Sequence, residues 1–134
     1  MAEFIMKQLV KEAGCADEFE IASAAVSTEE IGNDIYPPAK RMLAARGVPF
    51  EHRAARQMTR ADYAYYDHIV CMDQSNLRWL KYIIGEDSDH KVSLMMAWVG
   101  KSRDVSDPWY TGDFTKAYND ILEGCKGMMK ELKN

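Results

Sequence analysis

The sequence predicts an α/β fold in which helices flank a parallel sheet. Three apolar segments, 19–26, 68–73 and 91–99, have the length and composition of buried strands. Between and after them, apolar residues recur every three or four positions, as in amphipathic helices. This alternation favours a parallel sheet, because parallel neighbours are joined by crossover connections. At 134 residues, the chain is expected to form a single domain, residues 1–134.

The first part of the chain predicts a helix, a strand and a loop. Apolar residues at helical spacing between positions 4 and 10 indicate the helix, and Gly14 is a natural place for it to end. Residues 19–26, FEIASAAV, then read as an apolar strand that passes into small side chains. Residues 27–38, STEEIGNDIYPP, are rich in turn-forming residues and predict a loop.

The rest of the chain alternates helices with strands. Residues 37–47, PPAKRMLAARG, predict a helix that starts at two prolines, whose fixed φ suits the first turn, and ends at Gly47. A short helix is expected next, entered through Thr59. The remaining predicted elements are a strand at 68–73, a helix at 76–85, a strand at 91–99 and a helix at 114–132.

Composition and charge argue against two classes of partner. The chain has 17 basic and 21 acidic residues, a net charge of −4, and no clustered basic stretch, so we expect no nucleic-acid partner. No apolar run is long enough to span a bilayer, so we expect no membrane partner. The N-terminal residues MAEFIMKQLVKEAG lack the basic region of a secretory signal.

The cysteines and histidines do not form a recognisable site. Cys15, Cys71 and Cys125 are scattered, without the C-x-x-C or Cys/His spacing of a zinc site. The three histidines are isolated, and none forms a recognisable arrangement with a serine or cysteine. We therefore expect three reduced thiols in a cytoplasmic protein, with no metal ion and no other cofactor.

Cys71 is the cysteine whose position most resembles that of a nucleophile. It ends a predicted parallel strand, where the sites of α/β proteins form, and Arg78 follows at C-x6-R spacing. A phosphate-binding loop needs successive backbone N–H groups that point inward. Residues 72–77 contain no glycine, however, and Asp73 would repel a phosphate. We therefore predict that Cys71 is a core thiol and that Asp73 is the N-cap of the next helix.

The segment DPWYTGDF, residues 107–114, is the strongest candidate for a site. Asp-Pro alone predicts only a turn, because aspartate bonds the local backbone and proline fixes φ. The adjacent Trp109 and Tyr110 favour a pocket, since exposing two neighbouring aromatic side chains in a loop is costly. Asp107 then has the setting of an acid that protonates a leaving group, although the chain shows no nucleophile to accompany it.

Four stretches together resemble the low-molecular-weight protein tyrosine phosphatase family. They are SAAVSTEEIGN, YPPAKRMLAARGVPF, ARQMTRADYAYYDHIVCMDQSNLR and DVSDPWYTGDF, and the likeness extends from Met1 nearly to the C-terminus. The resemblance implies a metal-free cytoplasmic hydrolase whose substrate is a phosphotyrosine-containing protein or a small aryl phosphate. In that family a cysteine attacks the phosphorus, and an arginine clamps the phosphoryl oxygens.

The resemblance also assigns roles to residues around the acid. Asp107 matches the general acid that protonates the departing tyrosyl oxygen and then activates the water that hydrolyses the phosphocysteine. Trp109 and Tyr110 match the aromatic wall over the substrate ring. The expected catalytic residue is therefore Asp107, with two aromatic residues beside it that bind substrate.

Three further residues are assigned by the same likeness. Ser23 matches the residue that supports the phosphate loop, and Glu29 and Glu30 fall in a substrate-facing loop that varies within the family, where they would form an acidic rim. Tyrosine phosphatases, arginine phosphatases and the related arsenate reductases differ partly within the phosphate loop. Phosphotyrosine, phosphoarginine and arsenate therefore remain alternative substrates.

The family's nucleophilic loop, C-x5-R-S/T, is not found in the sequence. In the family it joins the first strand to the first helix, and here the first helix starts at Met1, so we expect a chain truncated at its N-terminus. We expect these 134 residues to be inactive alone. The alternative is a catalytically dead pseudophosphatase that binds a phosphopeptide or another partner. Reductase-like thiol chemistry at Cys71 is disfavoured, because no second cysteine is adjacent in sequence.

The strand that the resemblance implies to be missing is an internal one. It would lie between the strands predicted at 19–26 and 68–73, so its loss would leave them about 9–10 Å apart, twice the usual spacing of about 4.8 Å. Three outcomes follow: the two strands pair directly, another chain supplies a strand, or the protein is largely unfolded alone. We expect self-association through the exposed strand edges.

Overall fold

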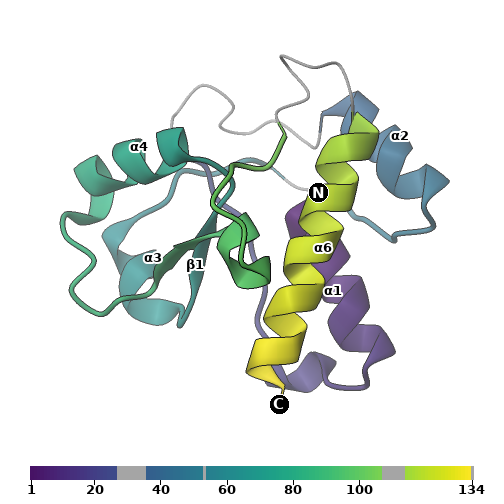
Figure 1. Ribbon diagram of the computed structural model, residues 1–134, viewed down its shortest axis with the longest axis horizontal. Helices are drawn as coiled ribbons and strands as arrows, with labels where there is room; N and C mark the ends of the chain where they lie inside the picture. The colour runs from purple at the N-terminus through teal and green to yellow at the C-terminus, as the bar shows by residue number, and fades with distance from the viewer. Residues whose placement is uncertain (27–35, 53, 107–113, 134) are drawn as a thin grey trace.

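The computed structural model describes residues 1–26, 36–52, 54–106 and 114–133 of the chain (Figure 1). The elements in chain order are α1 (Ala2–Glu12), η1 (Ala16–Glu18), α2 (Pro37–Ala45), α3 (Arg60–Tyr65), β1 (Ile69–Cys71), α4 (Gln74–Ile84), β2 (Val92–Leu94), η2 (Met95–Val99) and α6 (Phe114–Leu132). Both η1 and η2 are short 3-10 helices. The predicted α/β class is confirmed: α1 and α6 lie on one side of the sheet, and α3 and α4 lie on the other (Figure 1).

The predicted helices are confirmed, and their ends follow the signals in the sequence. The last helix spans residues 114–132 as predicted, and α2 begins at two prolines. The short helix α3 is entered through Thr59, whose side chain accepts the Asp62 N–H while the Asp62 carboxylate accepts the Thr59 N–H, as in a capping box. No helix in the described ranges is both long enough and apolar enough to cross a bilayer.

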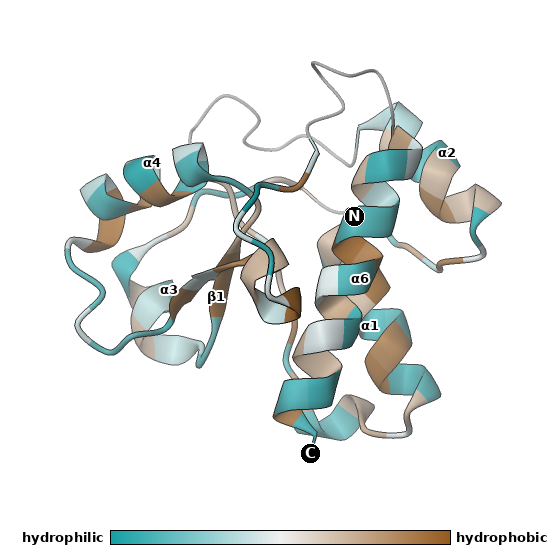
Figure 2. Ribbon diagram, in the orientation of Figure 1, coloured by the Kyte–Doolittle hydropathy of each residue, from teal (hydrophilic) through white to brown (hydrophobic). Residues whose placement is uncertain are grey.

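The core lies among α1, α2, η2 and α6. The largest side chains with almost no exposure are Ile5, Leu43, Met96 and Cys125, one from each of these elements. Along both α1 and α6, apolar and polar residues alternate around the helix (Figure 2). The two helices pack against each other, and α6 also packs against η2. The apolar faces that the sequence predicts are thus buried in one shared core.

The sheet of the described chain has two strands. β1 and β2 run parallel, with Ile69 opposite Val92 and Cys71 opposite Leu94. The strand predicted at 68–73 is therefore confirmed as β1. The strand predicted at 91–99 is confirmed only in its first part, because β2 ends at Leu94.

Beyond Leu94 the strand prediction is wrong, because the chain turns into the 3-10 helix η2. Met95 and Met96 of this helix are buried, and η2 packs against α6. Gly124 of α6 permits the close approach, since a Cβ built there would lie 2.5 Å from Met95 Cγ. The apolar run MMAWV therefore fills the core as a helical turn, and packing outweighs its strand-like composition.

The strand predicted at 19–26 is also wrong over most of its length. Within the described part of the chain, the one strand-like bridge of this segment is at Ala25: its N–H donates to the Arg56 carbonyl at 2.7 Å, and its carbonyl accepts the Met58 N–H at 2.8 Å. Among the residues described, no ladder joins this segment to β1. Segment 19–26 and β1 therefore do not pair directly in the described chain, so this one of the three expected outcomes is wrong. An apolar segment without a ladder partner stays irregular, because a strand is defined by its pairing.

Candidate functional site

Most of the predicted site residues lie outside the part of the chain that the structure describes. These residues are Glu29, Glu30, Asp107, Trp109 and Tyr110. Ser23 is described, and so are the residues that bound the two segments: Val26 and Tyr36 for the acidic segment, and Ser106 and Phe114 for the Asp-Pro segment. The described residues therefore define the supports from which both segments leave.

Residues 104–106, which immediately precede the predicted acid, are anchored one after another. The Gln74 N–H donates to Asp104 Oδ1 at 3.1 Å, and the Val105 N–H donates to the Met72 carbonyl at 2.9 Å. Gln74 is the first residue of α4, and Met72 directly follows β1. Both contacts hold the connection against the carboxyl end of a parallel strand, the edge at which the sites of α/β proteins form.

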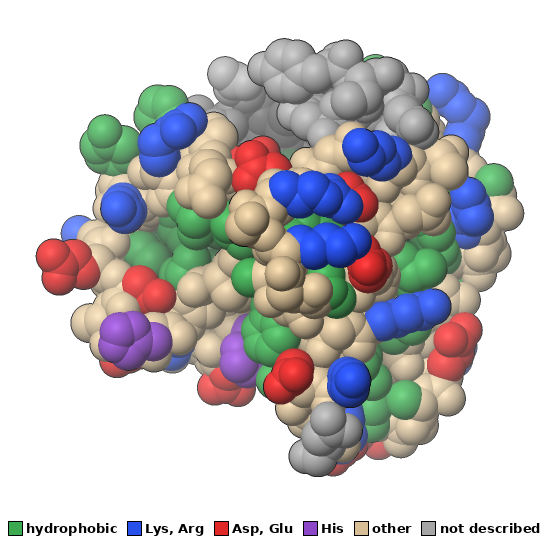
Figure 3. All heavy atoms as spheres, in the orientation of Figure 1, with side chains coloured by type: hydrophobic (Ala, Val, Ile, Leu, Met, Phe, Trp, Pro, Cys, Tyr) green, Lys and Arg blue, Asp and Glu red, His purple; other side chains and the backbone are tan. Residues whose placement is uncertain are grey.

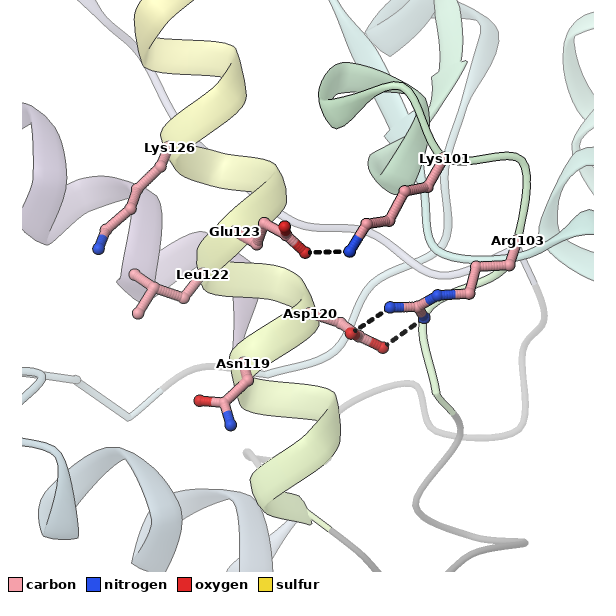
Figure 4. A pocket seen from close by; sticks show the side chains of 7 residues that line it. All are labelled: Lys101, Arg103, Asn119, Asp120, Leu122, Glu123 and Lys126. Atoms are coloured by element: carbon pink, nitrogen blue, oxygen red, sulfur yellow. Dashed lines mark hydrogen bonds and ion pairs between the residues drawn. The ribbon is translucent and has the colours of Figure 1, made fainter.

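Ser106 is held by a carboxylate on α6. Its N–H donates to Asp120 Oδ2 at 3.0 Å, and Asp120 also accepts two hydrogen bonds from the Arg103 guanidinium, at 2.7 and 2.8 Å (Figure 4). Among the described residues, Asp120 is the one charged side chain that is buried. The hydrogen bond from Arg103 lowers the pKa of Asp120, and the same bond raises the pKa of Arg103. The ionised carboxylate thus fixes the connection at residues 103 and 106.

A hollow lies beside this ion pair, between α6 and the connection that follows η2 (Figure 4). It is lined by Lys101, Arg103, Asn119, Asp120, Leu122, Glu123 and Lys126. Lys101 pairs with Glu123 at 2.9 Å, just as Arg103 pairs with Asp120. Two of its cations are thus already paired with carboxylates. The hollow therefore marks a packing contact between α6 and the connection, which we call the α6 seam. No group of three or more His, Cys, Asp or Glu residues in the described ranges is arranged to hold a metal ion.

The downstream ends of the two candidate segments adjoin each other. Tyr36 follows the acidic segment and caps α2, whereas Phe114 follows the Asp-Pro segment and begins α6. The centroids of their rings lie 6.0 Å apart, with the ring planes tilted by 31°. The structure therefore brings together the points at which the predicted acidic rim and the predicted acid segment rejoin the core, although they are distant in sequence.

Ser23 connects segment 19–26 to the first turn of α1. Its hydroxyl donates to Glu3 Oε1 at 2.6 Å, and the Lys7 ammonium pairs with Glu3 Oε2 at 2.7 Å on the outer side. The Ser23 side chain is partly buried in this contact. A serine expected to support a phosphate-binding loop is thus placed against the N-terminal turn of a helix, where partial positive charge favours anions.

The three thiols of the chain are all free and buried. Burial, together with the nearby Asp73 carboxylate, raises the pKa of the Cys71 thiol to about 11, and burial raises that of Cys125 to about 12. Asp73 caps α4 by accepting the Asn76 N–H at 2.7 Å. The prediction that Cys71 is a core thiol, followed by an N-capping aspartate, is confirmed, because Cys71 is buried and Asp73 forms the cap. The raised pKa has the opposite sign to that of a nucleophilic cysteine.

The clamp between Arg103 and Asp120 was missed by sequence reasoning. One signal was available: Asp120 lies within the apolar stripe of α6, between Tyr118 and Ile121, where a charged residue is expected to have a partner. The sequence does not reveal that this partner is Arg103, since the two residues are brought together by the packing of α6. The roles predicted for Asp107 and its aromatic neighbours remain predictions.

The model of the family described as low molecular weight phosphotyrosine protein phosphatase matches residues 1–134. A rat (Rattus norvegicus) protein named low molecular weight phosphotyrosine protein phosphatase is 33% identical over 136 residues, covering 98% of this chain and 85% of its own length.

Two solved structures show the same fold. The crystal structure of YfkJ from Bacillus subtilis superposes with a TM-score of 0.92 at 28% identity and covers 98% of this chain and 84% of its own. The crystal structure of DARP, a drosophila arginine phosphatase, superposes with a TM-score of 0.87 at 25% identity and covers 99% of this chain and 88% of its own.

Proposed function

This chain belongs to the low molecular weight phosphotyrosine protein phosphatase family. We propose that it provides the general acid of that family's catalytic site and the aromatic residues beside it. In this proposal Asp107 protonates the departing tyrosyl oxygen and later activates water, while Trp109 and Tyr110 hold the substrate ring. The substrate is a phosphotyrosine-containing protein or a small aryl phosphate, and Glu29 and Glu30 form an acidic rim beside it. The proposed location is the cytoplasm, where the three free thiols stay reduced.

The observation that carries this proposal is the anchoring of residues 104–106. Three consecutive residues are held by three different supports: the first residue of α4, the end of β1, and the buried Asp120 carboxylate. A general acid must stay within hydrogen-bond reach of the atom that it protonates. The residues from which the acid segment leaves the fold must therefore be held in place. An ordinary surface turn needs no such support.

We propose further that the 134-residue chain alone does not hydrolyse phosphomonoesters. The sequence contains no C-x5-R-S/T motif, and the thiols of Cys71 and Cys125 have pKa values raised to about 11 and about 12. Without a thiolate and a clamping arginine, the acid has no reaction to assist, and acid catalysis alone contributes only about 10²–10⁴-fold. Ser23 would then support no phosphate loop and would serve only to tie its segment to α1.

An assay of the purified chain with p-nitrophenyl phosphate at mildly acidic pH tests this proposal. The expected result is no turnover above the buffer background, for both the chain and its Cys71→Ser variant. Sustained turnover that disappears in Cys71→Ser would overturn the assignment of Cys71 as a core thiol. Sustained turnover that survives that substitution would show that a group outside our proposal acts as the nucleophile.

A second function is favoured by the same pairing of features, a supported acid segment in a chain without the nucleophile motif. In this alternative the protein is a pseudophosphatase that binds a phosphopeptide or another partner without turning it over. Titration with a phosphotyrosine peptide distinguishes the two, with the unphosphorylated peptide as control. Phosphate-dependent binding that weakens in Trp109→Ala would favour the pseudophosphatase, because that substitution removes an aromatic wall.

We also propose that the chain self-associates through strand edges. The Ile69 N–H donates to the Lys91 carbonyl at 3.0 Å, toward β2. The N–H and C=O of the next residue, Val70, therefore point to the opposite edge of β1. That edge has no ladder partner among the residues described, and neither does most of segment 19–26. Unpaired edges of this kind are the usual route by which strands of two molecules pair.

A further inference from the structure

The outer face of α4 carries two large aromatic side chains that do not join the core. Trp79 is 57% exposed and Tyr82 is 82% exposed. Residues three apart lie on the same side of a helix, and the two ring centroids are 5.7 Å apart with planes tilted by 46°. Single exposed apolar residues are ordinary, but a contiguous pair of aromatic rings is a feature of interaction surfaces.

The helix itself carries positive charge and no negative charge. Arg78 and Lys81 are exposed beside the two aromatic residues, and the helix Gln74–Ile84 contains no Asp or Glu. Neither cation forms an ion pair with any residue in the described ranges. Hydrophobic and basic side chains stand together over α4 at the upper left of Figure 3. This local positive charge contrasts with the net charge of −4 of the whole chain.

The helix presents these side chains on a fixed support. Leu80 is buried on the inner face, Asp73 caps the N-terminus, and Gly85 ends the helix with a φ of 73°. The Arg60 guanidinium donates to the Ile83 carbonyl at 3.0 Å, which adds a third cation at the last turn. A surface that is already rigid loses little conformational entropy when it binds.

We propose that the α4 face, formed by Arg78, Trp79, Lys81 and Tyr82, docks an acidic segment of a partner protein that also carries apolar side chains. Tryptophan, tyrosine and arginine are the residue types that contribute most to binding at protein interfaces. The unpaired cations select carboxylates, and the two rings provide area for leucine or phenylalanine side chains. The inference does not depend on the proposed phosphatase chemistry.

Charge favours this occupant over two others. A second copy of the chain would bring the same cations face to face if α4 packed on α4, because a two-fold interface is self-complementary. An anionic bilayer is an extended surface, so it would also face the acidic remainder of a chain whose net charge is −4. At physiological ionic strength, charges interact over about 8 Å. A short acidic segment bound on α4 would therefore interact mainly with the cations of the α4 face and little with the acidic remainder of the chain.

Titration of the full chain with a short synthetic peptide tests the proposal. The probe consists of glutamate residues interspersed with leucine and phenylalanine, and the control peptide has glutamine in place of glutamate. Nuclear magnetic resonance spectra of the isotope-labelled chain are expected to show shifts at the amides of α4 and at the Trp79 indole N–H. Fluorescence anisotropy of labelled peptide supplies the affinity, and binding is expected to weaken as ionic strength rises.

Matched charge variants make the test specific. The double variant Arg78→Gln/Lys81→Gln is expected to bind the acidic peptide about tenfold more weakly, as the loss of two partly exposed ion pairs implies. The control Lys126→Gln/Lys130→Gln removes the same charge from exposed positions on α6 and is expected to leave the affinity unchanged. Trp79→Ala/Tyr82→Ala is expected to weaken binding with the charges kept in place.

Four results would each overturn the proposal. The two charge variants could weaken binding equally, or the glutamine peptide could bind as well as the acidic one, and either would remove the basis for a specific acidic partner. Peptide-induced shifts confined to elements other than α4 would place the contact elsewhere. Binding to phosphatidylserine-containing vesicles without binding to the peptide would show that the face recognises a lipid surface.

Discussion

Replacing Asp120 by asparagine is expected to loosen the connection that leads into the acid segment. The substitution keeps the side-chain shape but exchanges one acceptor oxygen for an NH₂ group. An amide oxygen at the Oδ2 position can still accept from Ser106 and from Arg103 Nη1, but Arg103 Nη2 then faces a donor, and the negative charge that faces Arg103 is lost. Hydrogen bonds to buried charged groups contribute about 1.5–3 kcal/mol. Because the Arg103 side chain is 44% exposed and screened by water, we expect the free energy of unfolding to fall by about 1–2 kcal/mol.

Glu123→Gln supplies the matched control in the α6 seam. Glu123 pairs with Lys101 across the surface, with both side chains more than 40% exposed, so its loss is expected to cost about 0–0.5 kcal/mol. Urea denaturation followed by far-ultraviolet circular dichroism gives both free energies under one set of conditions. Equal losses for Asp120→Asn and Glu123→Gln would refute the reasoning, because it rests on the burial of Asp120 and on the three hydrogen bonds that Asp120 accepts.

The pH dependence of the same comparison follows from the lowered pKa of Asp120. A carboxyl whose pKa is lower in the folded state stabilises the fold above its unfolded pKa of about 3.9, and this contribution is lost as the pH falls through the folded pKa. The stability gap between the wild type and Asp120→Asn should therefore be constant near neutral pH and narrow below about pH 4. A gap that persists unchanged at low pH would mean that the charge of Asp120 is not its source.

Three further outcomes are expected. Gly127→Ala should lower the free energy of unfolding by about 1–3 kcal/mol, because the new Cβ would lie 2.7 Å from the Trp98 carbonyl oxygen. Gly124→Ala should cost less, because the nearest atoms there belong to the flexible Met95 side chain. The reverse order of the two losses in urea denaturation would contradict this. In a chain joined to a C-x5-R-S/T strand and loop, Asp107→Asn should slow hydrolysis of phosphotyrosine more than that of p-nitrophenyl phosphate, whose leaving group needs little protonation, and equal losses would make Asp107 structural. Size-exclusion chromatography with light scattering should show an oligomer, and a cooperatively unfolding monomer would refute association through strand edges.

The helices were predictable because their signals are local. The apolar spacing of residues 114–132, the prolines at 37 and 38 and the capping threonine at 59 each lie within the helix that they specify. The strands were less predictable, because a strand exists only where a partner lies beside it. Segment 19–26 has the composition of a strand, but its one bridge to another described residue is at Ala25. Residues 95–99 also have an apolar composition but fill the core as a 3-10 helix.

The site was predictable in part, for a related reason. The helix cap at Asp73 is a short pattern that sequence reading finds directly, whereas residues 107–113 lie outside the described residues, so the site assigned to them stays a prediction. The clamp that supports the segment joins Arg103 to Asp120, and the ring contact between Tyr36 and Phe114 joins parts of the chain still further apart. Such contacts depend on how α6 packs against the rest of the fold, which no local pattern encodes.

The supports of the acid segment do not involve any thiol of the chain. Asp104 is held by the start of α4, Val105 by the residue after β1, and Ser106 by α6, and all three contacts are formed within the described chain. None of them involves Cys71 or another thiol. Loss of turnover therefore does not imply loss of structure on the acid side, and the stability of Asp120 variants reports on that side even in a chain without catalysis. The anchoring of residues 104–106 does not depend on turnover, and both the phosphatase and the pseudophosphatase proposals require it.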